Sequence, residues 1–286
     1  MKKYFSLVLF AHSIFAMPFA MIGFFLGVTT TQNPFHWYLL VLVILCMVFA
    51  RNAAMAFNRY LDRNIDAQNP RTQMRDIPAG RVSANEALLF VIINCVLFIA
   101  ATFFINKLCF YLSPVALFVV LFYSYTKRFT ALCHLVLGLG LSLAPIGAYI
   151  AVTGQFNIVP LFYSFAVLFW VSGFDIIYAL QDEDFDREQK LHSIPAALGI
   201  KNALNLSVVL HILSAACVIM PLFYAELSWV YDIGIVFFCA MLIYQHLLVK
   251  PTDISKVDRA FATTNGFASV IFALCFLLDT FLRTRS

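Results

Sequence analysis

Long apolar runs alternate with short polar segments along the chain. A membrane-spanning helix needs roughly 20 apolar residues, because the hydrocarbon core of a bilayer is about 30 Å thick. Nine runs fit this requirement, and they lie at about 4–28, 36–57, 85–105, 108–126, 131–153, 158–180, 204–224, 228–249 and 260–282. The pattern therefore predicts an all-α polytopic membrane protein in which residues 1–286 form one domain.

The segments that connect these runs alternate in charge. Those after the first, third, fifth and seventh runs are short and nearly uncharged, whereas those after the second, fourth, sixth and eighth hold most of the charged residues. An N-terminus on the inside places almost all Lys and Arg on one side, which the positive-inside rule assigns to the cytoplasm. We therefore expect an integral membrane protein with its N-terminus and its charged segments facing the cytoplasm.

Two of the charged segments carry polar residues at helical spacing. RNAAMAFNRYLDRNID aligns four of them on one face, and DIIYALQDEDFD aligns four more, because residues three, four and seven apart share a helix face. The members of the two faces are Arg51, Asn58, Asp62 and Asp66, and then Asp175, Tyr178, Asp182 and Asp186. A solvated loop needs no such phasing. Asp175 also lies inside an apolar run, where an ionisable group is costly and usually marks function.

The surroundings of the two faces are similar. Each is followed by a polar segment with an Ile-Pro step and then a glycine, at Ile77–Pro78 and Gly80 in one case and at Ile194–Pro195 and Gly199 in the other. This weak internal repeat suggests two four-helix halves plus a final helix.

Composition supports the membrane interpretation. Of the 286 residues, 62% are hydrophobic and 12% are charged, and the mean hydropathy is +0.87, whereas soluble domains contain about 25% charged residues. The net charge of +4 forms no basic face outside short loops, so nucleic acid is not an expected partner. The seven cysteines lie in or beside apolar runs without a CxxC pair, which favours packing over disulfides or metal binding.

Clustered carboxylates repel one another unless cations occupy the site. Hard oxygen ligands favour Mg²⁺, which binds a few carboxylates together with substrate phosphate oxygens. The two acidic faces would thus hold one or two Mg²⁺ ions that bridge a diphosphate and stabilise it as a leaving group. Arg51, Lys127 and Arg128 would complete the anion site, although Lys127 and Arg128 are equally well explained as a cytoplasmic membrane anchor.

These residues resemble a known family. NRYLDRNID is an NxxxDxxxD motif, and DIIYALQDEDFD is similar to the DxxYAxxDxxxD motif of the UbiA superfamily of intramembrane prenyltransferases. The resemblance extends to HSIFAMPFA, IPAGRVS, YSYTKRFT and HSIPAALG, and the first motif region is most similar to the 4-hydroxybenzoate polyprenyltransferase branch. Phe185 departs from the pattern, because many relatives carry a further Asp there. Asp184 lies off the acidic face, which argues against a metal role.

The resemblance implies a helical bundle around a central cavity that opens sideways to lipid, in a bacterial inner membrane. It also implies Mg²⁺-dependent transfer of a polyprenyl chain from a polyprenyl diphosphate to an aromatic acid, with 4-hydroxybenzoate for ubiquinone synthesis as the first expectation. Prenylation of a dihydroxynaphthoate for menaquinone is the alternative. A cation-coupled transporter is the alternative of a different class, disfavoured because the carboxylates gather at one membrane face. No obligate protein partner is indicated.

The same resemblance assigns roles to the candidate residues. One metal is expected on Asn58, Asp62 and Asp66, and the other on Asp182 and Asp186. Asp175 and Tyr178 lie deeper and would steady the allylic cation or orient the acceptor, acting with Asp62 and Asp182 as the catalytic group. The expected substrate-binding residues are Arg51, Tyr123, Lys127 and Arg128 for the diphosphate, Arg71, Lys190 and Ser193 as a cap over it, and Ser13 for the acceptor. The histidines within the apolar runs show no ligand spacing.

Overall fold

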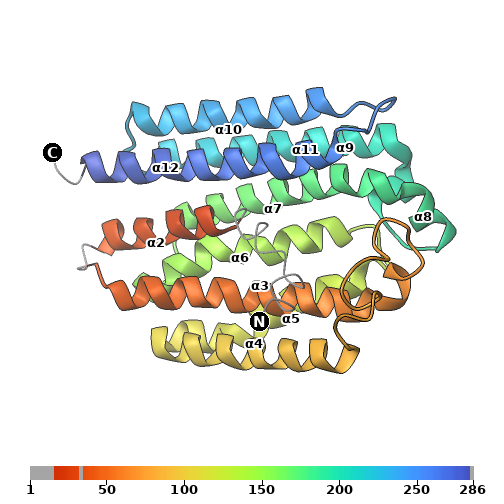
Figure 1. The fold of residues 1–286 in the computed structure, drawn as a ribbon. Helices are drawn as coiled ribbons and strands as arrows, with labels where there is room; N and C mark the ends of the chain where they lie inside the picture. Colours follow the sequence, from red (N-terminus) through yellow and green to blue (C-terminus); the bar gives the residue numbers. More distant parts are fainter. Residues whose placement is uncertain (1–15, 32–34, 284–286) are drawn as a thin grey trace.

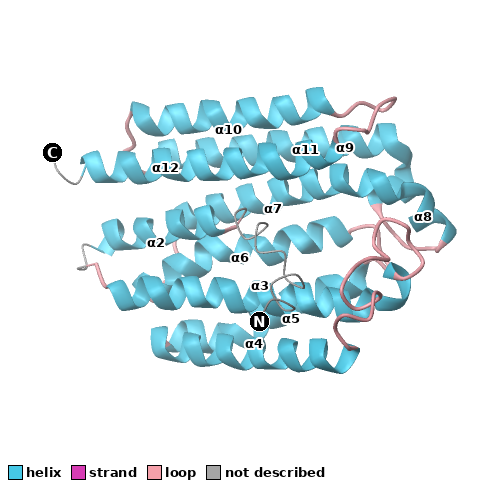
Figure 2. Ribbon diagram, in the orientation of Figure 1, coloured by secondary structure: helices cyan, strands magenta, loops and turns pink. Residues whose placement is uncertain are grey.

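The computed structural model describes residues 16–31 and 35–283. Within these ranges the chain is a bundle of roughly parallel and antiparallel helices with its connecting loops at the two ends (Figures 1 and 2). The long helices are α2 (Met17–Thr31), α3 (Trp37–Asp66), α4 (Ala84–Ile105), α5 (Lys107–Thr126), α6 (Cys133–Thr153), α7 (Ile158–Ala179), α9 (Ile194–Ile219), α10 (Trp229–Leu248) and α12 (Asn265–Arg283). Helical structure is expected here, because a bilayer offers no partner for unpaired backbone groups.

The short helical segments lie next to the long ones. A 3₁₀ turn (Leu180–Asp182) and α8 (Glu183–Glu188) follow α7, and a second 3₁₀ turn (Met220–Phe223) follows α9. The three-residue α11 (Val257–Arg259) and a π-helical turn (Ala260–Thr264) lead into α12.

Eight helical segments in the described ranges are long and apolar enough to cross a membrane, and α2 is a shorter apolar helix. The prediction of an all-α protein with about nine spanning helices is therefore confirmed. The first predicted span, 4–28, lies within the described residues only from residue 16 onward. The seven cysteines, all inside the described ranges, form no disulfide.

Two helix boundaries differ clearly from the prediction. Helix α3 continues beyond residue 57 to Asp66, so the first acidic motif belongs to a spanning helix. Helix α9 begins ten residues before the predicted 204, because the Ser193 side chain accepts a hydrogen bond from Ala196 N and Pro195 occupies the first turn. Gly199, with φ of +75°, separates this short first piece from the rest of α9.

The helices pack in an order that places two of them at the centre. α3, α4 and α5 form a group on one side and α7, α9, α10 and α12 lie on the other, with α2 and α6 between them (Figure 1). The close packing of α2 on α6 depends on Gly23 and Gly27, four residues apart. A Cβ on Gly23 would overlap the Pro145 carbonyl, and one on Gly27 would lie 2.9 Å from Val152 Cβ. Small residues at this spacing let membrane helices approach each other closely.

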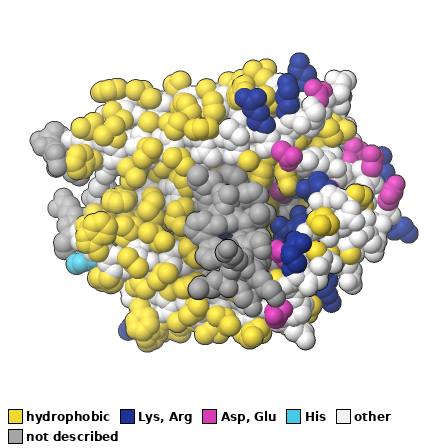
Figure 3. Space-filling model, in the orientation of Figure 1, with side chains coloured by type: hydrophobic (Ala, Val, Ile, Leu, Met, Phe, Trp, Pro, Cys, Tyr) yellow, Lys and Arg dark blue, Asp and Glu magenta, His cyan; other side chains and the backbone are white. Residues whose placement is uncertain are grey.

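Charged side chains gather at one end of the bundle. Figure 3 shows Lys, Arg, Asp and Glu concentrated around α8 and the neighbouring loops, while hydrophobic side chains cover much of the rest of the visible face. The segments that meet at this end include the loop of residues 67–83, the end of α5 and the segment of residues 183–193. The charged segments predicted to share one side of the membrane therefore share one end of the fold.

Candidate active site

The first acidic face lies on the last turns of α3. Asp62 and Asp66 are buried, and Asn58 Nδ2 donates a hydrogen bond to Asp62 Oδ2 at 3.1 Å. Lys127 Nζ lies 2.6 Å from Asp62 Oδ2, and Arg128 Nη2 lies 2.9 Å from Asp62 Oδ1. The two basic residues at the end of α5 thus flank one carboxylate, so they do more than anchor the helix at a membrane surface.

Asp66 is the second buried carboxylate of this face. Its Oδ1 accepts from Arg75 Nη1 at 2.7 Å, while its Oδ2 is buried and accepts no hydrogen bond within the described part of the chain. Thr72 donates instead to the Asp66 backbone carbonyl at 3.1 Å. One carboxylate oxygen therefore remains free for a further electropositive partner.

The second acidic stretch does not form a continuous α-helix. Helix α7 ends at Ala179, and a 3₁₀ turn of three residues precedes α8. The expectation of one straight helical line through Asp175, Tyr178, Asp182 and Asp186 is therefore wrong beyond Ala179. The tighter 3₁₀ turn changes the angle between successive side chains.

Asp182 is tied to the loop that follows the first motif. Arg71 forms an ion pair with it, with Nε donating to Oδ1 at 2.9 Å, and Asn69 Nδ2 donates to the same oxygen at 3.0 Å. Arg71 Nη1 also donates to the Tyr178 hydroxyl at 2.9 Å, and its guanidinium lies over the Tyr178 ring. The two motifs, far apart in sequence, therefore meet in one site. Burial alone would lower the pKa of Arg71, but its contacts with Asp182 and Tyr178 raise it above its ordinary value.

The second charged loop is joined to α5 through its backbone. His192 N donates to the Lys127 carbonyl at 2.7 Å. Asp186 interacts with the Ser193 hydroxyl and lies near the charges of Asp182 and Lys127. Lys190 is exposed and adopts a positive φ of 54°. This arrangement brings Ser193 to the carboxylates and leaves Lys190 at the rim.

Asp175, the first residue of the second motif, lies between α6 and the mouth of the site. Asp175 sits in α7, where its Oδ2 is 2.7 Å from His134 Nδ1 on α6. Tyr123 of α5 is close enough to Asp62 and Asp175 to interact electrostatically with both. The space in front of Tyr123 is therefore bordered by both motifs. Ser13 lies outside the described residues.

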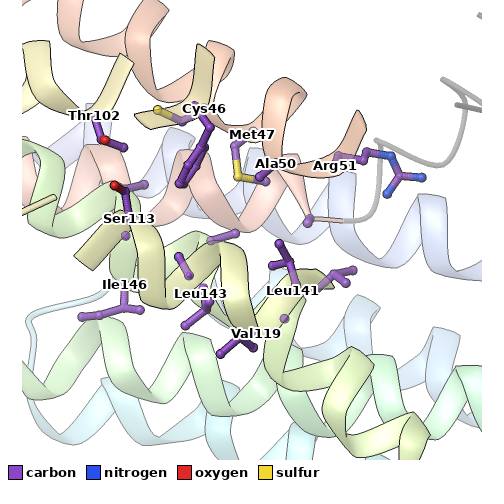
Figure 4. Close-up of a pocket in the computed structure, with 18 of the residues that line it drawn as sticks. Cys46, Met47, Ala50, Arg51, Thr102, Ser113, Val119, Leu141, Leu143 and Ile146 are labelled. Atoms are coloured by element: carbon purple, nitrogen blue, oxygen red, sulfur yellow. The ribbon is translucent and has the colours of Figure 1, made fainter. Parts of the chain in front are cut away.

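A long apolar cavity of about 380 Å³ begins beside this charged end. It runs between α2, α3, α4, α5 and α6, and Arg51 and Tyr123 form part of its wall. Figure 4 shows Arg51 at one end of the cavity and Thr102 and Ser113 at the other. Its lining on α5 extends from Tyr123 to Cys109, which corresponds to about 21 Å of helix.

Two arginines near the cavity and the first motif have unpaired nitrogens. Arg51 Nε and Arg59 Nη1 are buried and make no hydrogen bond to any described residue. Buried guanidinium donors without partners are expensive in an apolar environment. Together with the free oxygen of Asp66, they indicate a site that is completed by a ligand with both anionic and cationic parts.

The residues present fit Mg²⁺. No cluster of three or more His, Cys, Asp or Glu preformed for a metal occurs in the described part of the chain, because Lys and Arg side chains hold the carboxylates. The donor set is nevertheless all oxygen, since Asn58 would offer its amide oxygen, and one buried oxygen of Asp66 accepts no hydrogen bond from the described residues. Hard oxygen donors near anion-binding Arg and Lys suit Mg²⁺ that binds together with phosphate.

Arg59 lies three and seven residues before Asp62 and Asp66 on α3, so helical spacing already places it on their face. Two other site residues have no signal in the sequence: Asn69 belongs to a polar stretch with many equivalent side chains, and His134 is a single histidine in an apolar run. Arg75, in contrast, lies in the loop expected to cover the site. Only the packing of α6 on α7 and the folding of the first loop over the second motif bring these residues to the carboxylates.

The fold and the site define an integral membrane protein with an acidic site at the mouth of an apolar cavity. Such a site suits a substrate with an anionic head and a long apolar tail. The chain belongs to the UbiA prenyltransferase family, whose sequence model matches residues 16–273. The predicted family and the predicted enzyme class, a prenyltransferase similar to the 4-hydroxybenzoate polyprenyltransferases, are therefore confirmed.

Individual relatives agree with this assignment. The chain is 31% identical over 236 residues to a 4-hydroxybenzoate octaprenyltransferase from Tolumonas auensis, covering 82% of both chains. It is 30% identical to one from Nitrosospira multiformis, covering 87% of this chain and 85% of the relative. An apo structure of a UbiA homologue from Aeropyrum pernix is 31% identical with a TM-score of 0.83, covering 94% of this chain and 98% of the homologue.

A more distant structure shares the fold. A UbiA homologue from Archaeoglobus fulgidus, bound to DMAPP and Mg²⁺, is 21% identical with a TM-score of 0.77, covering 98% of this chain and 99% of the homologue.

Proposed function

We propose that this protein transfers a polyprenyl chain from a polyprenyl diphosphate to an aromatic acid, with 4-hydroxybenzoate as the first candidate, in quinone biosynthesis. The observation that carries the proposal is the junction of the charged site with the apolar cavity: Tyr123 lines the cavity together with Arg51 and also lies near Asp62 and Asp175. A diphosphate head at the carboxylates and cations would leave its prenyl tail in the cavity. The relatives named as 4-hydroxybenzoate octaprenyltransferases support this acceptor.

Mg²⁺ is the proposed cofactor, held by Asn58, Asp62 and Asp66 on one side and by Asp182 and Asp186 on the other. When bound, it would supply Lewis-acid stabilisation of the departing diphosphate. Lys127, Arg128 and Arg71 now pair with Asp62 and Asp182, and they are close enough to pair with phosphate oxygens instead. Their positive charge would stabilise the negative charge that develops on the leaving group.

The remaining residues would handle the two organic parts. An allylic cation forms as the diphosphate departs, and the apolar wall of the cavity keeps water from it. The aromatic ring attacks this cation, and the ring proton is then lost. Tyr178, Asp175 and Tyr123 face this region, and Arg51 offers its unpaired Nε to an anionic group, either of the diphosphate or of the acceptor. Lys190 and Ser193 remain proposed cap residues and Ser13 a proposed acceptor contact.

We further propose that residues 1–286 form one catalytic domain in a bacterial inner membrane, with the site facing the cytoplasm. The gathering of Lys and Arg at the same end as the carboxylates supports this orientation through the positive-inside rule.

The function is tested by incubating purified protein in lipid with Mg²⁺, a labelled polyprenyl diphosphate and a panel of aromatic acids. We expect a prenylated product with 4-hydroxybenzoate. If product forms only with a dihydroxynaphthoate, that compound and not 4-hydroxybenzoate is the acceptor. Absence of product with every aromatic acid would overturn the proposed acceptor class. Diphosphate release, measured in the same samples, separates loss of the donor reaction from loss of the acceptor.

The cavity predicts a substitution that selects against long prenyl chains. A Cβ at Gly147 on α6 would meet nothing within 4 Å, and Gly147 lines the cavity well beyond its charged end. Gly147→Phe would place its ring in this space, so we expect loss of at least about tenfold in kcat/KM with an octaprenyl donor and a change within about threefold with a dimethylallyl donor. Gly147→Ala is the matched control and keeps both activities. If Gly147→Phe lowers kcat/KM equally for the long and the short donor, the prenyl tail does not occupy this cavity.

A further inference from the structure

We propose that His134 is a positioning residue for the reaction: its imidazole holds the Asp175 carboxylate in the orientation needed at the acceptor. This inference rests on the proposed function for the role of Asp175, whereas the contact itself belongs to the structure. His134 Nδ1 and Asp175 Oδ2 are 2.7 Å apart. The His134 side chain is 4% exposed and that of Asp175 is 23% exposed, so the carboxylate has one protected side and one side open to the site.

The contacts of the ring fix its tautomer. His134 Nε2 lies 3.3 Å from Ile194 N, at the start of α9. A backbone N–H can only donate, so Nε2 accepts and the proton of the neutral ring is on Nδ1. That proton is then donated to Asp175. This hydrogen bond occupies Oδ2 and leaves the second oxygen of Asp175 available as an acceptor.

The backbone around His134 is also held in place. Ser172, on α7, donates to the His134 carbonyl at 3.2 Å. One turn further along α6, a Cβ on Gly138 would overlap the Leu168 carbonyl and the Ser172 hydroxyl. Glycine at 138 therefore lets α6 approach α7 closely, and His134 lies on that same face because it is four residues earlier. The distance between the imidazole and the carboxylate is set by helix packing rather than by a loop.

His134 connects three elements of the site. From its place on α6, it contacts Asp175 on α7 and Ile194 at the first turn of α9. Asp175 in turn lies near Tyr123, at the mouth of the cavity. A carboxylate fixed at this point faces the place where the acceptor ring must lie to attack C1 of the prenyl chain. Two roles are open to it there, binding of the acceptor hydroxyl and removal of a proton.

A second pair of histidines, the buried His211 and the half-buried His246, provides a comparison. His211 Nδ1 lies 2.9 Å from His246 Nε2, and His211 Nε2 also contacts the Trp170 carbonyl at 3.3 Å, so both rings are hydrogen-bonded within the packing of α7, α9 and α10. Neither ring contacts a carboxylate of the two motifs in any hydrogen bond or ion pair of the described chain. His246 is therefore a control for the loss of a hydrogen-bonded histidine from the helix packing away from the two motifs.

The kinetic test compares three variants with His246→Leu. His134→Leu keeps an apolar side chain but removes the donor, and we expect kcat to fall about 100-fold with the KM for prenyl diphosphate changed less than about threefold. His134→Asn places an amide N–H near the position of Nδ1 and should recover at least about tenfold of the loss. In the Asp175→Asn background, His134→Leu should cause little further loss, because both substitutions remove the same interaction. His246→Leu should stay within about threefold of the wild type.

A spectroscopic experiment tests the hydrogen bond between His134 and Asp175, whatever the identity of the acceptor substrate. Nitrogen NMR of labelled histidines, with the His134 signal assigned by His134→Leu, should show a neutral ring protonated on Nδ1, and Asp175→Asn should shift that signal. A ring protonated on Nε2 alone, or one unaffected by Asp175→Asn, would overturn the pairing even if an aromatic acid is prenylated. Unchanged kcat in a folded His134→Leu variant would overturn the positioning role. Loss of activity with every aromatic acid in the wild type would refute only the proposed acceptor class.

Discussion

Asp62→Ala and Asp182→Ala are expected to lower turnover by at least about a thousandfold. Each substitution removes a carboxylate from one of the two faces proposed to hold the metal. Asp62 pairs with Lys127 and Arg128, and Asp182 pairs with Arg71. Their loss would therefore also misplace the cations proposed to bind diphosphate. Product formation from a labelled prenyl diphosphate measures the effect.

Asp184→Ala is the matched control, because Asp184 lies in the same acidic stretch but is exposed. We expect it to retain activity within about threefold of the wild type, as is usual for surface substitutions. Thermal unfolding in detergent establishes that all three variants are folded. Near-normal turnover in both Asp62→Ala and Asp182→Ala would reject the metal assignment.

Removal of divalent cations is the second change with a large expected effect. Chelation should abolish prenyl transfer, and Mg²⁺ should restore it, because the Asp66 oxygen without a partner and the neighbouring carboxylates form a hard-oxygen site. Binding of labelled prenyl diphosphate to the chelated protein should also weaken by at least about tenfold, since the metal and the diphosphate are proposed to share the site.

Zinc is the informative comparison in this experiment, because softer nitrogen and sulfur ligands, which favour zinc, are absent from the proposed donor set. We expect Mg²⁺ or Mn²⁺ to restore much more activity than zinc. Full activity after exhaustive chelation, verified by metal analysis, would contradict the proposal that turnover depends on a divalent cation.

The sequence is sufficient to predict those features of the fold that depend on a single helix. Apolar length alone predicts the spans, because each helix satisfies its own backbone in the bilayer. The first motif follows the predicted face since α3 continues without interruption through Asp66. The second motif departs from it at Leu180, where the turn becomes 3₁₀. No residue in ALQDED signals that change, as none is a glycine or proline.

Contacts between segments that are far apart in sequence cannot be predicted from the pattern of one helix at a time. Arg71 and Asp182 are 111 positions apart, and their pairing depends on how the loop after α3 folds over the end of α7. His134 has no neighbour in sequence with which it shares a ligand spacing, and only the close approach of α6 and α7 brings it to Asp175. Arg51 and Tyr123 were expected near the diphosphate, but their position in the wall of the apolar cavity required the packing of α3 against α5.

The cations that now neutralise the acidic faces have a thermodynamic consequence. Asp62, Asp66 and Asp182 each form an ion pair with a Lys or Arg of the chain. A divalent ion that takes over such a carboxylate leaves a basic side chain without its counter-ion, and a diphosphate that takes over the basic side chain leaves a carboxylate unpaired. Each ligand that binds alone therefore leaves an unpaired charge on the protein. When both bind, the carboxylates pair with the metal and the basic side chains pair with the diphosphate, so no protein charge is left unpaired. We therefore expect positive cooperativity between metal and diphosphate, in which each ligand raises the affinity of the other by the same factor.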